Sequence, residues 1–228
     1  MFATGAATAL LSEAGWRVVL RVATQGIGDA ADKLSASCEL LGIDEWGWLG
    51  TKDRWIDDGG ASGPRTLAAA DPSDLAAAVE QAITETRPQL VLTVGRDGLT
   101  GHPDHIAVSR AVQQQKIHAL GARLRAQDVQ VGYELMEQLL PGEKVGSGLV
   151  TGCTLPLREI GKAPESQRRQ ALDQYYAGLG TTDIPELLTT YGRRGDSLLL
   201  RAIFDVSGWD TDRFEVLSSS GSDVPSFP

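Results

Sequence analysis

The sequence predicts an α/β fold of the Rossmann-like type, with a mostly parallel sheet and helices on both of its faces. Strand-like and helix-like stretches alternate along the first half of the chain, which is the order of βαβ units. The run at 90–94, Leu-Val-Leu-Thr-Val, is apolar throughout, as in a parallel strand covered on both faces. With 228 residues, 42% of them hydrophobic, the chain is large enough for one globular core. We expect a single domain over residues 1–217 and a disordered tail over 218–228, which is rich in Ser, Gly and Pro.

The beginning of the chain is expected to hold two helix-strand units. The Ala- and Leu-rich stretch at 2–14 has no proline and favours a helix that ends at Gly15. The β-branched run at 17–23 favours a buried strand. The same order then repeats, with a helix over 29–41 and a short aromatic strand over 44–49.

The best-defined helix begins after Asp71, which is a good N-cap, with Pro72 at its first position. Apolar residues recur at helical spacing from there until the Arg-Pro pair at 87–88 ends the helix. In the second half of the chain the pattern is less regular. There we expect a helix over 168–176 and a strand over 197–204.

The composition excludes several classes of partner. The chain has 21 Lys and Arg against 30 Asp and Glu, and its net charge of -9 has the wrong sign for binding nucleic acid or an anionic membrane surface. No apolar run is long enough for a transmembrane helix. Residues 1–16 lack the features of a secretion signal, and Cys38 and Cys153 have no Cys-x-x-Cys spacing, so we expect a cytoplasmic protein. Whether the chain forms a homo-oligomer stays open.

The segment Gly-His-Pro-Asp-His at 101–105 is the main candidate for chemistry. It follows the predicted strand at 90–94, and ligands bind at the carboxyl ends of strands in open parallel sheets. Imidazole and carboxylate groups are zinc ligands, but His102, Asp104 and His105 in one helical turn cannot all bind one ion comfortably. One histidine on the metal, with the aspartate orienting the other ring, fits better. In the alternative, His102 is a helix cap and Asp104 complements the helix dipole.

Two further aspartates are candidates for substrate binding. Asp57 lies in a long acidic and glycine-rich loop, where a carboxylate can bind substrate hydroxyls or act as acid or base, although such a loop can also be a solvated turn. Asp97 lies in the glycine-containing loop before the histidine motif. Dinucleotide-binding, P-loop and serine-hydrolase motifs are absent from the sequence. The arginine pairs at 168–169 and 193–194 are expected on the surface.

The stretch from 87 to 105 resembles the LmbE/PIG-L family of zinc-dependent de-N-acetylases, which includes the mycothiol-pathway deacetylase and amidase. The resemblance extends over roughly the first half of the chain. It implies that His105 is a ligand of one zinc ion and that His102 polarises the scissile carbonyl or stabilises the oxyanion. It also implies that Asp104 holds a histidine in place and that Asp57 contacts the sugar. The implied substrate is a small molecule, an N-acetylated amino sugar such as an N-acetylglucosamine conjugate.

The sequence also departs from this family. The family has a His-Pro-Asp-Asp-Glu motif at the end of a first strand, directly before the helix that corresponds to 2–14. That motif provides two zinc ligands and the general base, and this sequence starts just after its position, so we expect strand, ligands and base to be missing. Ala30 and Lys33 stand where the family carries Arg and Glu, Thr100 replaces a catalytic tyrosine, and no histidine occurs near 175–176. A truncated gene model and a degenerate paralogue both explain these departures.

Three functions are compatible with these observations. The first is metal-dependent hydrolysis of an N-acetyl amide. The second is a zinc hydratase on the same scaffold, acting on unsaturated dicarboxylates, because a fold does not fix its chemistry. The third is a metal-free remnant that binds a sugar or a partner. If the first strand is missing, its neighbours should expose unpaired edges, and we expect the chain to associate or aggregate.

Overall fold

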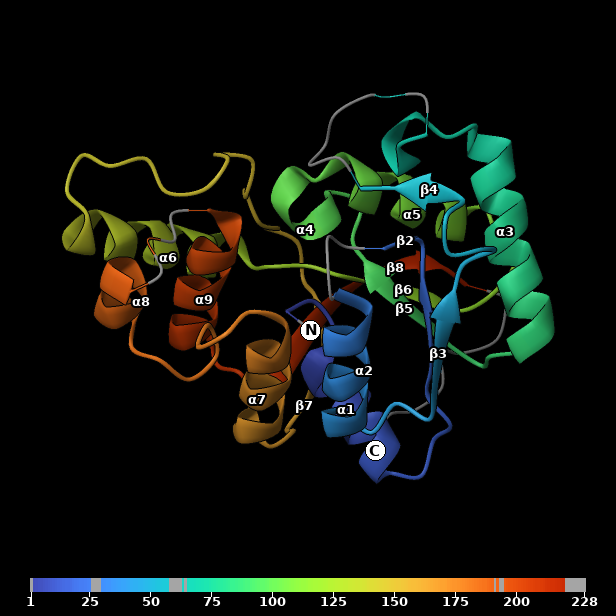
Figure 1. The fold of residues 1–228 in the computed structure, drawn as a ribbon, viewed down its shortest axis with the longest axis horizontal. Helices are drawn as coiled ribbons and strands as arrows, with labels where there is room; N and C mark the ends of the chain where they lie inside the picture. Colours follow the sequence, from blue (N-terminus) through green and yellow to red (C-terminus); the bar gives the residue numbers. More distant parts are fainter. Residues whose placement is uncertain are drawn as a thin grey trace.

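Parallel strand pairs form the N-terminal part of the fold (Figure 1). This computed structural model describes residues 2–25, 30–57, 63, 65–190, 192 and 195–219. β1 (Val19–Val22) pairs in parallel with β3 (Glu45–Trp48), and β2 (Thr24–Gln25) pairs in parallel with β4 (Trp55–Ile56). Two helices belong to this part, α1 (Gly5–Glu13) and α2 (Ala30–Leu40).

A four-stranded mixed sheet makes up the second group, in the order β5-β6-β8-β7. Its strands are β5 (Val91–Val94), β6 (Ala119–Ala122), β7 (Arg158–Gly161) and β8 (Thr211–Ser218). β5 and β6 are parallel, whereas β8 runs antiparallel to both β6 and β7. The predicted α/β class is therefore confirmed, and the C-terminal half adds an antiparallel part that the sequence did not indicate.

Helices cover both faces of the sheet at β5. On one face, Val91 packs in a cluster with residues of α3 (Pro72–Thr86) and α5 (Pro103–Gln113). On the other face, Leu90 and Leu92 pack in a cluster that includes Ala7 of α1. Side chains of a strand alternate between faces, so an unbroken apolar run is what a strand covered twice requires.

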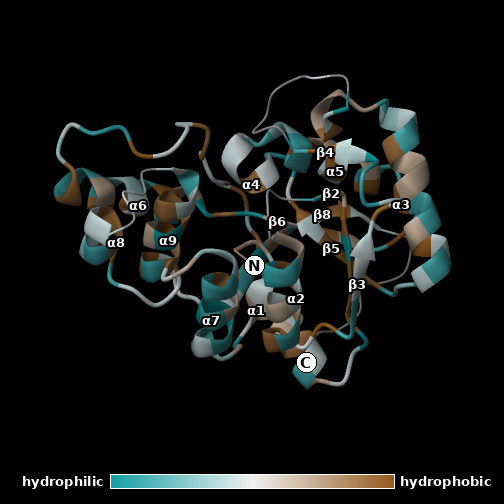
Figure 2. Cartoon of the chain, viewed as in Figure 1, coloured by the Kyte–Doolittle hydropathy of each residue, from teal (hydrophilic) through white to brown (hydrophobic). Residues whose placement is uncertain are grey.

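The remaining helices are η1 (Leu67–Ala69), α4 (Gly98–Gly101), α6 (Ala126–Leu139), α7 (Glu165–Tyr175), α8 (Ile184–Thr190) and α9 (Asp196–Ser207). Of these, α6, α8 and α9 lie beyond the sheet, on the left in Figure 1. α6, α8 and α9 share the largest hydrophobic cluster, whereas α7 is coloured mostly hydrophilic in Figure 2. No helix among the described residues is long and apolar enough to span a membrane.

The helices and strands expected in the first half of the chain are confirmed, and so is the helix expected over 168–176, now α7. The strand expected over 197–204 is wrong, because this segment belongs to α9. All residues from 198 to 204 are buried in α9, and a helix buried all round shows the same continuous apolar run as a buried strand. The tail was expected from residue 218, but Ser218 still belongs to β8. Residues 220–228 lie outside the described residues, and so does the arginine pair at 193–194.

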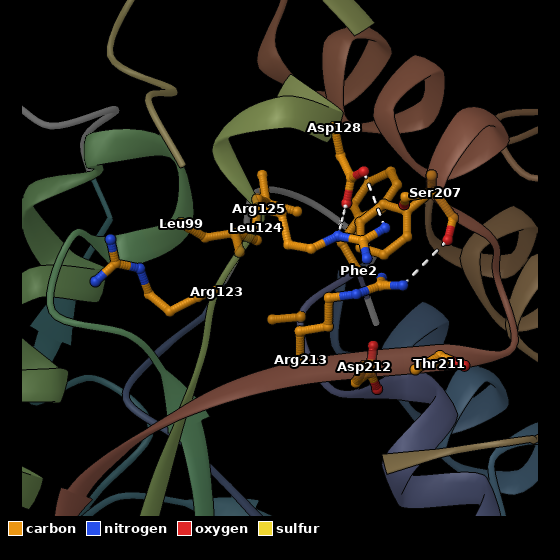
Figure 3. A pocket seen from close by; sticks show the side chains of 12 residues that line it. Phe2, Leu99, Arg123, Leu124, Arg125, Asp128, Ser207, Thr211, Asp212 and Arg213 are labelled. Carbon is orange, nitrogen blue, oxygen red and sulfur yellow. Dashed lines mark hydrogen bonds and ion pairs between the residues drawn. The ribbon is translucent and has the colours of Figure 1, made fainter. Parts of the chain in front are cut away.

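Arg168 is fully buried, so the expectation of a surface position is wrong. Its Nη2 atom lies 2.7 Å from Oδ1 of the equally buried Asp212, and its guanidinium lies 4.2 Å from the ring centroid of Phe204. Asp212 also accepts a hydrogen bond from the backbone N of Ala7, at 2.8 Å. This ion pair therefore joins α7, β8 and the first turn of α1. A pocket of about 10 Å³ between Asp212, Phe2 and neighbouring residues has room for about one water molecule (Figure 3).

β1 and β5 face each other across a cavity of about 800 Å³, which we call the strand slot. Residues of β1 and β5 line its two sides, α1 lines it with Thr8 and Leu11, and α3 and α5 contribute the other walls. In the part of the chain that the structure describes, β1 pairs only with β3 and β5 pairs only with β6. The expectation of unpaired strand edges is therefore confirmed.

The strand slot lies between two short strands of equal length. β1 and β5 have four residues each, so an added strand of four or five residues would match both of them.

Candidate functional site

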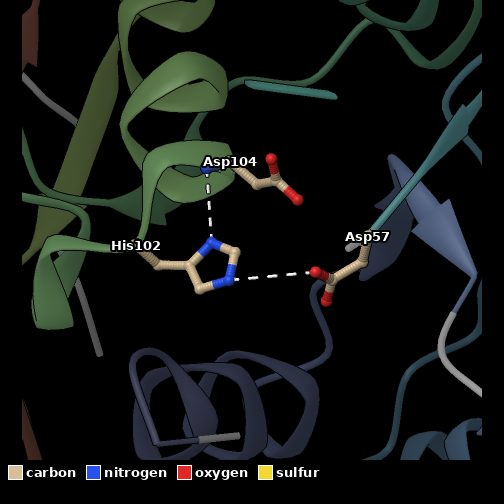
Figure 4. A group of neighbouring side chains, drawn as sticks. All are labelled: Asp57, His102 and Asp104. Carbon is tan, nitrogen blue, oxygen red and sulfur yellow. Dashed lines mark hydrogen bonds and ion pairs between the residues drawn. The ribbon is translucent and has the colours of Figure 1, made fainter. Parts of the chain in front are cut away.

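Asp57, His102 and Asp104 come together at the carboxyl end of the strands (Figure 4). Asp57 follows β4, while His102 and Asp104 lie at the start of α5, beyond β5. Each residue offers one ligand atom, and these three atoms lie within 4.8 Å of one another. The ring of His105 is the next neighbour, with its centroid 4.9 Å from that of His102. Four of the five predicted site residues thus form one cluster.

His102 is the N-cap of α5, so the structural interpretation of this residue is confirmed alongside its place in the cluster. Its Nδ1 atom accepts a hydrogen bond from the backbone N of Asp104, at 3.3 Å. A neutral imidazole that accepts at Nδ1 carries its proton on Nε2. The Nε2 atom points to Asp57, 3.9 Å from its Oδ1 (Figure 4). His102 is therefore set up as a hydrogen-bond donor toward the centre of the cluster.

His105 has the opposite tautomer. Its Nδ1 atom lies 3.0 Å from the carbonyl oxygen of Gly98. A carbonyl can only accept, so Nδ1 carries the proton and Nε2 keeps its lone pair. Desolvation lowers the pKa of His105, although the residue as a whole is exposed, and this favours the neutral ring. An imidazole held in this way has the orientation of a metal ligand.

Asp104 has a buried carboxylate oxygen that lacks a partner. The residue is 5% exposed, and its Oδ2 atom accepts no hydrogen bond from any described residue. Burial raises the pKa of this carboxyl group, and the neighbouring His102 opposes the shift. A buried acceptor without a partner is costly, and a cation would satisfy it. The contact that fixes the His102 ring comes from the backbone of Asp104 rather than from its carboxylate.

The donor set fits a divalent metal ion such as zinc. The three ligand atoms that lie within 4.8 Å of one another belong to Asp57, His102 and Asp104, and the Nε2 lone pair of His105 belongs to the neighbouring ring. Imidazole and carboxylate groups are ligands that zinc accepts. His102 would first have to give up its bond to the backbone of Asp104 before it could bind a metal through Nε2. The geometry therefore favours His105 as the imidazole ligand and His102 as the donor.

Asp97 lies behind the cluster instead of within it. One carboxylate oxygen accepts from the backbone N of Leu99 at 3.0 Å, and the other lies 3.1 Å from Nε of Arg123. Both oxygens of the predicted substrate-binding residue thus contact the protein itself.

Tyr175 is a neighbour of the cluster that was not among the sequence candidates. It ends α7 and packs edge-on against Tyr176, with ring centroids 5.0 Å apart. Burial raises its pKa, and the nearby Tyr176 and the charge of Asp57 raise it further, so the phenol stays protonated at neutral pH. Nothing in the sequence pattern indicates that α7 and the loop after β4 converge here.

Residues 1–116 match the family described as PIG-L, GlcNAc-PI de-N-acetylase. The 1D-myo-inositol 2-acetamido-2-deoxy-alpha-D-glucopyranoside deacetylase of Kineococcus radiotolerans is 33% identical over 150 residues, covering 52% of this chain and 42% of that protein. The 1D-myo-inositol 2-acetamido-2-deoxy-alpha-D-glucopyranoside deacetylase 1 of Saccharopolyspora erythraea is 28% identical over 238 residues. The match covers 86% of this chain and 76% of that protein. The chain thus matches less than half of the length of the Kineococcus protein.

Two crystal structures share the fold. The deacetylase of the A40926 pseudoaglycone has a TM-score of 0.50 at 17% identity, covering 94% of this chain and 91% of that one. The zinc-inhibited form of teicoplanin deacetylase has a TM-score of 0.51 at 15% identity. The match covers 97% of this chain and 95% of that one. At these identities the likeness concerns the fold, and the family follows from the sequence match, which covers more than half of the chain. The protein belongs to the PIG-L family.

Proposed function

We propose that this chain carries the carbonyl-polarising half of a metal-dependent deacetylase that acts on an N-acetylated amino sugar or its conjugate. The observation that supports this most directly is the pair of opposite tautomers of His102 and His105 beside the partnerless oxygen of Asp104. The deacetylases of acetamido-glucopyranosides among the relatives make this substrate class the natural choice. A cytoplasmic location and one zinc ion per chain are part of the same proposal.

Each residue has one task in this proposal. His102 donates its Nε2 proton in a hydrogen bond to the acetyl carbonyl oxygen, and the bond strengthens as negative charge develops there. His105 would offer Nε2 to zinc and Asp104 and Asp57 would offer carboxylate oxygens, and the ion would supply Lewis-acid chemistry when bound. The side chain of Asp57 is 43% exposed, so its carboxylate can also accept from a sugar hydroxyl.

We further propose that a strand occupies the slot and completes the site. A strand parallel to β1 and β5 ends at the same edge of the sheet as they do, which is the edge that carries His102. α1 lines the slot and leads into β1, so a strand placed directly before α1 would make an ordinary βαβ unit. Its last residues would then contribute the remaining metal ligands and a general base.

Acetate release tests the proposed function. The chain is incubated with zinc and a panel of N-acetylglucosamine conjugates, alone and with a strand fused before α1 whose last residues supply the remaining metal ligands and a general base. Acetate release that depends on His102 supports the deacetylase. Loss of the ultraviolet absorbance of an unsaturated dicarboxylate, without acetate release, would support the hydratase instead. If neither reaction occurs in either form, the protein is a binding remnant.

A further inference from the structure

We infer that Asp97, held by Arg123 and Glu215, is a positioning residue that fixes the tautomer of His105. This inference rests on the proposed function, in which His105 offers Nε2 to a metal. It concerns residues that do not touch the metal or the substrate: Asp97 precedes α4, Arg123 follows β6, and Glu215 lies in β8.

The first step is the turn between β5 and α5. Leu99 adopts φ 67° and ψ -46°, a backbone conformation that residues with a side chain rarely take, and the residue is 5% exposed. Such a conformation persists only where its surroundings impose it. Asp97 does so from two sides, since its carboxylate accepts from the backbone N of Leu99 at 3.0 Å and its carbonyl accepts from the backbone N of Gly101 at 3.0 Å.

The second step is the anchoring of Asp97. Nε of Arg123 lies 3.1 Å from Oδ2 of Asp97, and Nη1 of the same guanidinium donates to Oε1 of Glu215 at 3.0 Å. That oxygen of Glu215 also accepts from the backbone N of Arg96, at 2.8 Å. The three side chains are only 13% to 21% exposed, so solvent screens these contacts weakly. The turn is thereby tied to two strands of the sheet.

The third step leads to His105. The turn places the carbonyl oxygen of Gly98, which accepts the Nδ1 proton of His105 at 3.0 Å. Gly98 has φ +67°, and a Cβ atom there would lie 2.9 Å from Ile106 and 3.1 Å from the Cβ of His105. The peptide is therefore closely packed against α5. If the turn relaxes, Nδ1 loses its acceptor, and the tautomer with a protonated Nε2, which cannot bind a metal through Nε2, becomes populated.

The test compares two neighbouring arginines. Arg123→Met removes both ion pairs of the positioning chain. Arg125→Met is the matched control, because Arg125 forms a bidentate pair with Asp128, at 2.7 and 3.0 Å, and lies on the other side of Leu124 from Arg123 (Figure 3). Asp97→Asn is a milder variant that keeps an acceptor for Leu99 but loses the charge toward Arg123.

The first readout is the tautomer of His105 in the metal-free protein, from nitrogen-15 NMR of its ring. The chain has 3 His, so His105→Gln assigns the signal. We expect the Nδ1-protonated form in the wild type and in Arg125→Met, and a mixture in Arg123→Met and Asp97→Asn. The second readout is the zinc dissociation constant from competition with a chelating dye, which we expect to weaken about 10- to 100-fold in the same two variants. Arg123→Lys should recover part of the loss, because one ammonium cannot pair with both carboxylates as the guanidinium does.

The inference is overturned if Arg123→Met and Asp97→Asn keep the wild-type tautomer and zinc affinity. It is also overturned if Arg125→Met changes both readouts as strongly, since the effect would then be a general loss of structure. The tautomer measurement needs neither metal nor substrate. It can therefore succeed even if no acetate is released, which separates this inference from the proposed function.

Discussion

The rings of His102 and His105 lie 4.9 Å apart and carry their protons on different nitrogen atoms. In each case the main chain determines the tautomer, through the N–H of Asp104 for His102 and the carbonyl of Gly98 for His105. Two histidines in one helical turn thus differ in chemistry, because His102 offers a proton donor at Nε2 and His105 offers a lone pair at Nε2.

Substitution of His102 should separate its cap role from its chemical role. His102→Ala loses the N-cap of α5, and we expect a loss of stability of under about 1 kcal/mol. His102→Asn restores a good cap but provides no donor at the position of Nε2, so it should have wild-type stability and no acetate release. Urea unfolding and an acetate assay check the pair. Activity in His102→Asn would contradict the donor role, and unchanged stability in His102→Ala would contradict the cap role.

Substitution of His105 should remove the metal. Protein purified without chelator is expected to contain about one zinc ion per chain, provided that the other ligands are present. His105→Ala should lose this zinc, whereas His118→Gln, which changes the histidine outside the cluster, should keep it. Elemental analysis of the three proteins checks this. Zinc retained in His105→Ala would show that the ligand role is wrong.

Filling the strand slot should make the chain monomeric and more stable. Without a strand, the unpaired edges of β1 and β5 favour association, so we expect oligomers at micromolar concentration in sedimentation velocity. A five-residue apolar strand fused before α1 should remove them and raise the melting temperature. The control carries proline at the centre of this strand, because proline cannot donate to the ladder. A monomer that unfolds cooperatively without any added strand would contradict the prediction.

The buried pair of Arg168 and Asp212 should respond unequally to single and double substitutions. Arg168→Met leaves a buried carboxylate without its cation, and we expect it to cost about 3–5 kcal/mol of unfolding free energy. Adding Asp212→Leu removes the stranded charge and should recover most of this loss. Urea unfolding of the three proteins measures the effect. A double variant that is less stable than Arg168→Met would show that the hydrogen bond from Ala7 to Asp212 matters more than the charge.

The N-cap of α3 should make stability depend on pH in the acidic range. Hydrogen bonds from the side chain and the backbone of Ser73 lower the pKa of Asp71 below the ordinary value of an aspartate. The folded state thus favours the ionised form, so the contribution of Asp71 is present above the unfolded pKa and is lost as the pH falls through the folded pKa. Asp71→Asn keeps a cap without this titration. Unfolding curves between about pH 5 and pH 2 should show a smaller decrease for the variant than for the wild type.

Local signals account for the parts of the fold that could be predicted. Asp71 and Pro72 begin α3, and Pro103 begins α5, because the caps and proline positions act within one turn. The strand prediction for residues 197–204 was wrong because a helix buried on all sides and a buried strand have the same apolar pattern.

The site was predictable only in part. His102, Asp104 and His105 are close in sequence, so their proximity follows from one motif. Asp57 reaches them because β4 and β5 end at the same edge of the molecule, and that depends on the tertiary fold. The anchoring of Asp97 needs a contact between Arg123 and Glu215, which are 92 positions apart. No pattern in the sequence indicates such a contact.

The position of β8 between β6 and β7 has a consequence for how this protein folds during synthesis. Ala122 of β6 pairs with Phe214, and Arg158 of β7 pairs with the same residue, so the β5-β6 pair and β7 cannot join one sheet until residues 211–218 have left the ribosome. Contacts over such separations form slowly, because the loops between them must close first. The nascent chain is therefore expected to expose the edge of β6 that β8 later covers while residues 123–218 are being synthesised.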